Sequence, residues 1–336
     1  MNAPVSRHGV DAGPPLPERV LVTGGAGFIG ANLCRSLVEE GVPKVVVLDN
    51  LSTGRVENLT GIDVELVEGS ILDGDLVGSL VAHSDAVVHL AARPSVPRSL
   101  QDPGATHEAN ATGTLRVLEA AAEGTKPHVL VASSSSVYGT NNRLPANEDL
   151  RPMPLSPYAA SKLAAEAYAL AFSQSYGVPI LTFRFFNVFG PLQRPDHDYA
   201  AVVPAFVSAA LSGSPLRIHG DGSQTRDFTF VGSVVGILLE ALRRQTTAPG
   251  PVNLAFGGRT SVLGLAELIQ GVLRRPLQLE HVEPRAGDVR HSQADTTRLR
   301  QLFPTLEPVK LTDGLRSTVE WMSTESSGPE RAVLAG

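Results

Sequence analysis

Short apolar runs alternate with longer helical segments through the first half of the chain. Runs of this kind, nearly continuous in apolar residues, are typical of strands that are covered on both faces. Their alternation with helices predicts an α/β fold with a doubly wound parallel sheet, because parallel neighbours need crossover connections. The strands are expected at Arg19–Val22, Lys44–Leu48, Val64–Val67, Ala86–Leu90, Val129–Ala132 and Pro179–Phe185.

Helices are expected between these strands, and the pattern loosens beyond Gly190. Past that point several prolines and glycines break the chain into short pieces, which indicates a smaller C-terminal α/β lobe over the carboxyl edge of the sheet. Trp321, in the last predicted helix, is expected to pack in the core. The predicted helices are Phe28–Glu40, Ala105–Glu123, Ala159–Gln174, Asp295–Leu302 and Thr312–Met322.

Composition sets outer limits on the protein. With 336 residues, 42% of them hydrophobic, the chain can bury a large core in two lobes. The net charge of −6 argues against nucleic-acid binding, and the lack of a long apolar run argues against a membrane span. The single cysteine, Cys34, is expected in the core and fits the reducing cytoplasm. We expect no metal site, a disordered tail at residues 1–17 and a flexible C-terminus at 326–336.

A glycine-rich turn follows the first predicted strand and opens the first predicted helix. Gly24, Gly27 and Gly30 allow the chain to turn tightly, to approach a pyrophosphate and to pack the helix on the strand. The N-terminus of that helix presents free N–H groups and a positive dipole to phosphates. Because the motif lies between a strand and a helix, it predicts a Rossmann-type dinucleotide site.

Asp49 ends the second predicted strand, about 20 residues beyond the turn. A carboxylate there accepts hydrogen bonds from a ribose 2′-hydroxyl and repels a 2′-phosphate, which favours NAD over NADP. The alternative for Asp49 is a helix cap or turn residue. Arg55 is the residue that would suit a 2′-phosphate, but its distance from the strand end favours a solvated loop position.

Tyr158 and Lys162 lie four positions apart in a predicted helix that begins after Pro157. Residues with this spacing share one helix face, so the phenol and the ammonium point the same way. A cation near a phenol lowers its pKa from about 10 towards neutrality, which makes the tyrosine usable as an acid or base. A surface pair without function is the alternative, and the dinucleotide turn upstream argues against it.

Further motifs occur in order along the chain. They are His89-Leu90-Ala91-Ala92, Asn110-Ala111-Thr112-Gly113-Thr114, Val137-Tyr138-Gly139, the stretch from Arg184 to Gly190 and the stretch from Gly220 to Phe228. With the glycine turn and the tyrosine–lysine pair, the chain resembles the extended short-chain dehydrogenase/reductase family, specifically its nucleotide-sugar epimerases and dehydratases. The chain departs from that pattern at Ser70, where the family often has Asp near the adenine.

The resemblance implies NAD as the cofactor. It places the NAD-binding domain at residues 18–190 plus about 232–256, and a nucleotide-sugar-binding lobe at 191–231 plus 257–325. The cofactor contacts that it implies are Gly24, Gly27, Phe28, Ile29, Gly30, Asp49, Asn50, Ser52, Thr53, Gly54, Ile71, Leu90, Ala91, Ala92, Asn110, Tyr158 and Lys162.

The same resemblance implies the catalytic set Ser134, Tyr158 and Lys162. Tyr158, ionised by Lys162 and the nicotinamide charge, takes the proton of the sugar 4-hydroxyl while NAD⁺ accepts the C4 hydride, which gives a 4-keto intermediate. Ser134 is the family's hydroxyl at four positions before Tyr138, although Ser135 is chemically alike and can face the substrate. Ser133 is expected at the strand end or facing solvent.

Substrate contacts are also implied by the resemblance. Arg226 and Arg285 match positions that clamp a pyrophosphate, for which arginine's forked donors are suited. Ser292 matches a position whose size gates the C2 substituent, so a serine there leaves room for an N-acetyl group. The substrate-contact residues are Ser95, Val96, Arg98, Ser134, Ser135, Ser136, Asn187, Val203, Arg226, Arg285, Asp288 and Ser292, of which Asp288 is more a brace of its loop.

The outcome implied for the 4-keto intermediate is hydride return at C4. Related dehydratases and decarboxylases carry acidic residues after the catalytic hydroxyl, whereas this chain has Ser135 and Ser136. We therefore expect a 4-epimerase of UDP-GlcNAc/UDP-GalNAc, UDP-Glc/UDP-Gal or both, acting as a homodimer through residues 107–123 and 158–176. The alternatives are a UDP-glucuronate 4-epimerase, a 4,6-dehydratase and a non-catalytic NAD-binding protein.

Overall fold

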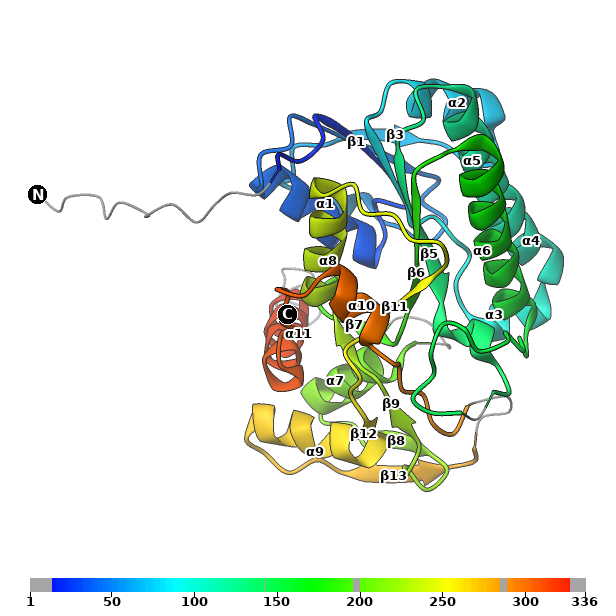
Figure 1. Ribbon diagram of the computed structural model, residues 1–336. Coiled ribbons are helices and arrows are strands. Elements are labelled where there is room, and N and C mark those ends of the chain that lie inside the picture. Colours follow the sequence, from blue (N-terminus) through cyan, green and yellow to red (C-terminus); the bar gives the residue numbers. More distant parts are fainter. Residues whose placement is uncertain (1–13, 142, 196–199, 285–288, 327–336) are drawn as a thin grey trace, which may run out of the picture.

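The computed structural model describes residues 14–141, 143–195, 200–284 and 289–326 (Figure 1). Of the two predicted flexible ends, residues 1–13 and 327–336 lie outside this range. The strands are β1 Arg19–Thr23, β2 Lys44–Asp49, β3 Glu65–Glu68, β4 Ala86–His89, β5 His128–Ser134, β6 Ile180–Phe185, β7 Val188–Phe189, β8 Leu216–His219, β9 Thr225–Arg226, β10 Thr229–Phe230, β11 Val252–Leu254, β12 Thr260–Ser261 and β13 Leu279–Val282.

Helices connect most of these strands. They are α1 Phe28–Glu39, α2 Gly74–Ala82, α3 Val96–Gln101, α4 Pro103–His107, α5 Gly113–Glu123, α6 Pro157–Tyr176, α7 Val202–Ser212, α8 Val231–Arg243, α9 Val262–Leu273, α10 Thr297–Leu302 and α11 Leu311–Ser326. Short helical turns occur at η1 Val56–Leu59, η2 Glu108–Thr112 and η3 Ser135–Tyr138, and η2 is a π-turn that joins α4 to α5.

Seven parallel strands form the main sheet in the order β11-β6-β5-β4-β1-β2-β3. The chain reverses its direction of winding between β1 and β4, which are neighbours in the sheet. In doubly wound sheets, ligands bind outside the carboxyl ends of the strands at this switch point. The predicted α/β fold with a Rossmann-type sheet is therefore confirmed.

Helices cover both faces of the sheet (Figure 1). On one face α1 packs beside α8, and Leu33 and Leu37 of α1 share a core with Val20 and Leu238. On the other face α2, α5 and α6 pack, and Leu118 shares a second core with Val87. Apolar side chains on both faces explain why the sequence of these strands is nearly continuous in apolar residues.

A smaller lobe lies beyond the carboxyl edge of the sheet, at the bottom of Figure 1. It combines the two-stranded sheets β8–β13 and β9–β12 with α7, α9 and α11. Phe206, Leu265 and Leu315, one from each of these helices, are buried together in its core. Trp321 packs against the same core, as the sequence predicts.

The predicted elements and the structure differ at several places. The helix predicted over 105–123 contains the π-turn η2, because one extra residue is accommodated where Asn110 turns inward. The late helix begins at Thr297 rather than Asp295, whose Oδ1 instead accepts a hydrogen bond from Thr297 N at 2.8 Å. The edge strand β11 was not predicted. Cys34 is buried in the core as expected.

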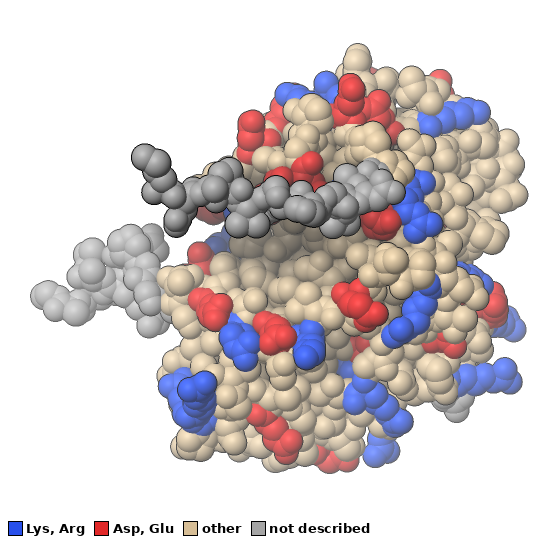
Figure 2. All heavy atoms as spheres, turned by 60° about the vertical axis from the view of Figure 1, so that its left-hand side comes forward, with Lys and Arg blue, Asp and Glu red and all other residues tan. Residues whose placement is uncertain are grey.

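Acidic and basic side chains are intermixed over the face shown in Figure 2. Surface ion pairs such as Arg243–Glu40 at 2.9 Å fit this mixture. None of the helices in the described ranges is long and apolar enough to cross a membrane. Within those same ranges, no group of His, Cys, Asp or Glu side chains is arranged to hold a metal ion.

Candidate active site

The glycine turn lies directly against the end of β4. Gly24 has φ of 73°, and a Cβ atom there would lie 2.7 Å from Ala91 N, so only glycine fits without strain. Its own N–H donates to Leu48 O at 2.8 Å, which ties the turn to β2 as well. The turn therefore holds the N-terminus of α1 between the carboxyl ends of the central strands.

A cavity of about 880 Å³ opens above this turn. It is large enough for a dinucleotide, since ligand sites typically measure about 300–1,000 Å³. Fifteen of the seventeen residues expected to contact the cofactor line it. They are Gly24, Gly27, Phe28, Ile29, Gly30, Asp49, Asn50, Ser52, Thr53, Ile71, Leu90, Ala91, Ala92, Tyr158 and Lys162.

The two remaining residues lie behind the cavity wall. A Cβ atom on Gly54 would come within 2.8 Å of Asp49 Oδ2, so this glycine lets the loop pack against the carboxylate. Asn110 is fully buried, and its side chain bonds the backbone of Arg93 and the hydroxyl of Ser161. Neither residue is among those that line the cavity, and their contacts with the cofactor stay predictions.

Asp49 has the turn-bracing role that its sequence position allowed, and its contact with a ribose stays a prediction. Its Oδ1 accepts from Leu51 N at 2.9 Å and its Oδ2 from Ala26 N at 3.0 Å, so it braces both its own turn and the glycine turn. It also lines the cavity. Burial raises the pKa of Asp49, while the two backbone N–H groups lower it.

The residues at this end of the cavity fit a dinucleotide. The N-terminus of α1 has neither a side-chain cap nor an acidic residue in its first turn, so its N–H groups face the cavity. Such a terminus attracts phosphate. Ser70, where the family often has Asp, also lines the cavity beside Ile71.

Ser134, Tyr158 and Lys162 meet at the other end of the same cavity. Ser134 is the serine of the four-serine run whose hydroxyl is close enough to act on the phenol, because it lowers the pKa of Tyr158. Lys162 is buried, and its Nζ donates to Ala132 O at 2.9 Å. The sequence brings these groups together because α6 begins at Pro157 and packs on β5.

The expected ionisation of Tyr158 depends on the nicotinamide charge as well as on Lys162, so it stays a prediction. Within the protein itself, burial raises the pKa of the phenol, and the Ser134 hydroxyl offsets part of that rise. Lys162 does not bring the pKa towards neutrality, because its ammonium is turned to the carbonyl of Ala132. Burial also lowers the pKa of Lys162 to about 8. The protein groups alone therefore keep the phenol neutral.

A buried histidine network, which the sequence did not reveal, supports this end of the cavity. Thr114 Oγ1 donates to Asn110 O at 2.6 Å and so accepts from His89 Nε2–H at 2.9 Å. His89 Nδ1 then accepts from Thr23 Oγ1 at 2.8 Å. Burial lowers the pKa of His89 to about 3, so the ring is neutral. The available signal was a polar residue closing an apolar strand, in His89-Leu90-Ala91-Ala92.

Ser133 lies at the end of β5, one of the two expected positions, and does not face solvent. It is buried, and its Oγ donates to Glu166 Oε1 at 2.5 Å. Side chains alternate between the two sides of a strand, so Ser133 and Ser134 serve different partners. Neither Ser135 nor Ser136 lines either of the two large cavities, since both lie in the turn η3.

A second cavity, of about 560 Å³, lies in the smaller lobe. Three of the residues expected to contact substrate, Asn187, Val203 and Arg226, line it, and Val188 lines both cavities. Arg217 and His219 line it too, and the sequence did not single them out because β8 gives no motif. The two cavities therefore adjoin at Val188, which lies in β7 just beyond the carboxyl end of β6.

The remaining expected substrate contacts are scattered. Arg98 lines the first cavity, while Ser95 caps α3 by accepting from Arg98 N at 3.4 Å and Val96 begins that helix. Ser292 lies beside Arg226, because its N–H donates to Thr225 O at 3.0 Å. Arg285 and Asp288 lie outside the described residues.

Comparison with known proteins gives one consistent family. The profile of the NAD dependent epimerase/dehydratase family matches residues 20–255. A UDP-glucose 4-epimerase of Mycolicibacterium smegmatis is 40% identical over 320 residues, which cover 92% of this chain and 99% of that protein. Decarboxylases and dehydratases of nucleotide sugars also match, at 29% to 33% identity.

Solved structures agree with the sequence matches. A UDP-N-acetylglucosamine 4-epimerase from Methanobrevibacter ruminantium has a TM-score of 0.86 and 35% identity, covering 91% of this chain and 98% of that one. A UDP-glucuronic acid 4-epimerase from Bacillus cereus, solved with UDP-glucuronic acid and NAD, has a TM-score of 0.83 and 30% identity, covering 91% and 99%.

Proposed function

We propose, since the chain belongs to the NAD-dependent epimerase/dehydratase family, that it interconverts the C4 epimers of a UDP-hexose. The observation that carries this proposal is the position of Tyr158 and Ser134, which line the first cavity together, while Val188 lines both that cavity and the second one. A sugar whose nucleotide occupies the second cavity would present its ring to that pair.

Each residue of the pair has a distinct task in this reaction. NAD, bound in the first cavity, supplies the hydride acceptor and donor and a positive charge beside the phenol. Tyr158 takes the proton from the 4-hydroxyl and later returns it, because the added positive charge lowers a pKa that burial had raised. Ser134 donates a hydrogen bond to the same sugar oxygen and so holds it in position.

The charges along the first cavity favour epimerisation over elimination. Asp49 is the only carboxylate among the described residues that line it. The order β5-β4-β1-β2 places three strand spacings between Asp49 and Ser134, about 14 Å. A dehydratase needs an acid or base near C5 and C6, and Ser135 and Ser136 stand where related enzymes carry one.

The second cavity supplies the substrate grip. Arg226 and Arg217 offer the cations that a diphosphate needs, and Asn187 offers an amide close to the junction of the two cavities. Ser292 pairs with the residue before Arg226, and its small side chain leaves room for an N-acetyl group. We therefore favour UDP-GlcNAc and UDP-GalNAc, with UDP-Glc and UDP-Gal as further substrates.

A second candidate substrate is UDP-glucuronate. Arg93 and Arg98 both line the first cavity, and either guanidinium would suit a sugar carboxylate. Arg93 is already paired with Asp102 at 3.3 Å, which weakens this alternative for that residue.

We also propose a homodimer with α6 in its interface. Tyr168, Leu170 and Tyr176 of α6 are 40%, 44% and 54% exposed. Large apolar side chains gathered on one helix are typical of a surface covered by a partner.

Incubation with UDP-GlcNAc, UDP-Glc and UDP-glucuronate in separate samples tests the function. We expect NMR of the anomeric protons to show a change of C4 configuration for UDP-GlcNAc, for UDP-Glc or for both. Tyr158→Phe should lower the rate by about 10²–10⁴-fold, because the proton acceptor is lost. Tyr168→Phe, an exposed tyrosine of the same helix, is the matched control. A 4-keto-6-deoxy product, or full activity in Tyr158→Phe, would contradict the proposal.

A further inference from the structure

The last three residues of β5 lie beside residues on a single face of α6. Lys162 Nζ donates to Ala132 O at 2.9 Å and Ser133 Oγ donates to Glu166 Oε1 at 2.5 Å. Ser134 lines the same cavity as Tyr158. Positions 158, 162 and 166 lie on one face because they are four residues apart. Glu166 is thus the third member of the face that carries the tyrosine and the lysine.

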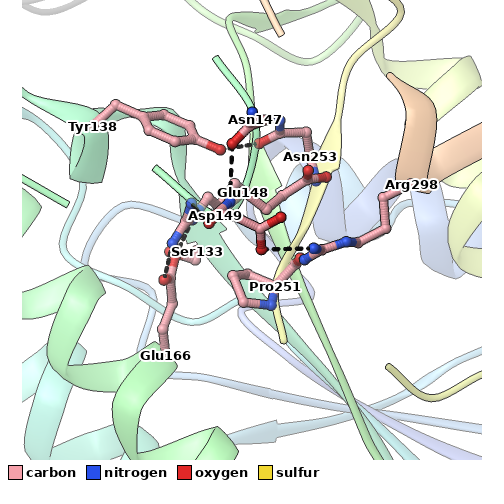
Figure 3. Close-up of polar contacts among 10 residues, drawn as sticks. Ser133, Tyr138, Asn147, Glu148, Asp149, Glu166, Pro251, Asn253 and Arg298 are labelled. Carbon is pink, nitrogen blue, oxygen red and sulfur yellow. Dashed lines mark hydrogen bonds and ion pairs between the residues drawn. The ribbon is translucent and has the colours of Figure 1, made fainter. Parts of the chain in front are cut away.

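The carboxylate of Glu166 is buried and held on both oxygens. Arg184 Nε donates to Oε1 at 2.9 Å and Arg184 Nη2 to Oε2 at 2.8 Å. Figure 3 shows the contact of Glu166 with Ser133, together with the polar side chains of Tyr138, Glu148 and Asn253. A buried ion pair contributes little stability compared with apolar packing. We therefore expect the Glu166–Arg184 pair to have a role other than stabilising the fold.

Arg184 is fixed from its other side. Its guanidinium lies 4.7 Å from the ring centre of Tyr138, and its Nη1 donates to Glu148 O at 3.3 Å. The Tyr138 hydroxyl in turn donates to Asn253 Oδ1 at 2.6 Å, and Asn253 N donates to Glu148 Oε1 at 2.8 Å (Figure 3). These contacts hold Arg184 in place, and Arg184 in turn holds the carboxylate of Glu166 in one orientation.

Lys162 needs a negative neighbour if it is to stay charged in this site. Among the charged groups on the elements packed against α6, His107, Glu108 and Arg116 are exposed to solvent, and Arg98 on α3 and Arg184 on β6 are positive. His89 on β4 is neutral. Glu166 is the buried carboxylate whose charge acts on Lys162. Burial lowers the pKa of Lys162, and Glu166 opposes this shift.

We propose that Glu166 is a positioning residue that keeps Lys162 charged, and that Ser133 and Arg184 hold its carboxylate in place for that purpose. Lys162 carries out its role in the reaction only as an ammonium, below its pKa. Without Glu166 the ammonium would lose its proton at lower pH, so the alkaline limit of activity would move down. The proposal deepens the proposed function and rests on it.

The ionisation of Lys162 can be measured directly in the protein with its bound NAD. The chain has four lysines, Lys44, Lys126, Lys162 and Lys310, so the ¹³C signals next to each ammonium can be resolved by NMR and titrated. In Glu166→Gln we expect the midpoint of Lys162 to fall by about 1 pH unit or more, since an opposite charge nearby shifts a pKa by this amount. The alkaline limb of kcat/KM should move by the same interval.

Glu148→Gln is the matched control, because it removes another buried carboxylate of the same network without facing Lys162. Its Lys162 midpoint should equal that of the wild type, whatever its effect on stability. If Glu166→Gln does not fold because Arg184 is left unpaired, Glu166→Gln/Arg184→Met removes both charges and should show a smaller fall, because the repulsion from Arg184 is removed as well.

An unchanged Lys162 midpoint in the folded Glu166 variant would overturn the proposal, as would an equal fall in Glu148→Gln. The titration needs no substrate. Its result can therefore be told apart from a failure of the proposed epimerase activity, which the sugar assays report.

Discussion

Asp227 shows how one buried side chain joins distant parts of the smaller lobe. Its Oδ2 accepts from Gly257 N at 3.0 Å and Ala294 N at 3.2 Å, and its Oδ1 accepts from Gly258 N at 3.0 Å. It follows Arg226, which lines the second cavity. The carboxylate therefore holds three chain segments around the proposed nucleotide site.

Asp227→Asn should destabilise the protein by about 2 kcal/mol, because an amide N–H₂ would face a backbone N–H that has no other buried acceptor. The change is read from the midpoint of urea unfolding. Asp221→Asn alters an exposed carboxylate nearby and should leave the midpoint in place. Equal midpoints for wild type and Asp227→Asn would show that the loops are held by other contacts.

Single residues could be predicted where their neighbours in sequence define the chemistry. Tyr158 and Lys162 share a helix, so their proximity follows from spacing alone. The ionisation of Tyr158 could not be predicted in the same way, because it depends on Ala132, which is distant in sequence and captures the Lys162 ammonium. The role of Glu166 was hidden for the same reason, since Arg184 and Ser133 come from other strands.

At the scale of elements, the junction of β1 with α1 depends on close approach of two strands. Gly24 faces the backbone of Ala91 at the end of β4. Gly41, at the end of α1, has a similar φ of 81° but nothing within 4 Å of an added Cβ atom. Substitutions at Gly24 and Gly41 therefore separate the free-energy cost of a left-handed backbone from the free-energy cost of steric overlap.

Gly41→Ala should lower the free energy of unfolding by about 1 kcal/mol, the cost of a left-handed alanine. Gly24→Ala should lower it by a further 1–3 kcal/mol or so through overlap with Ala91, and should weaken NAD binding more than about tenfold. Urea unfolding and calorimetric titration with NAD give the two quantities. Similar values for the two variants would mean that β1 and β4 separate readily.

Six of the seven strands of the main sheet could be predicted, because most of them are buried on both faces and so are nearly continuous in apolar residues. The short strands β7, β9, β10 and β12 have two residues each, and only their partners define them. The π-turn η2 was likewise invisible, because the helical pattern continues on both sides of it. It is the turn that brings Asn110 inward to Arg93 and Ser161.

At the scale of the whole molecule, the exposed face of α6 has consequences for assembly. Tyr168 of this helix is 40% exposed, and Leu279, on β13 of the smaller lobe, is 45% exposed. The two side chains are equally accessible but lie in different lobes. They allow the proposed dimer interface to be tested against a general effect of surface charge.

Tyr168→Glu should convert the dimer to a monomer, because an unpaired charge would be buried in the interface. Leu279→Glu should leave the dimer intact. Sedimentation velocity distinguishes the two masses. A wild-type protein that sediments as a monomer, or equal dissociation by both variants, would exclude α6 as the interface.

The sequence by itself determined the alternation of strands and helices, the glycine turn and the tyrosine–lysine face, because each is a local pattern of period, conformation or spacing. Only the tertiary structure decided which carbonyl holds Lys162, which carboxylate opposes its loss of charge and where the two cavities meet. These depend on the order of strands in the sheet, which brings residues far apart in the chain into contact. Buried electrostatics depends on such contacts, and no local pattern encodes them.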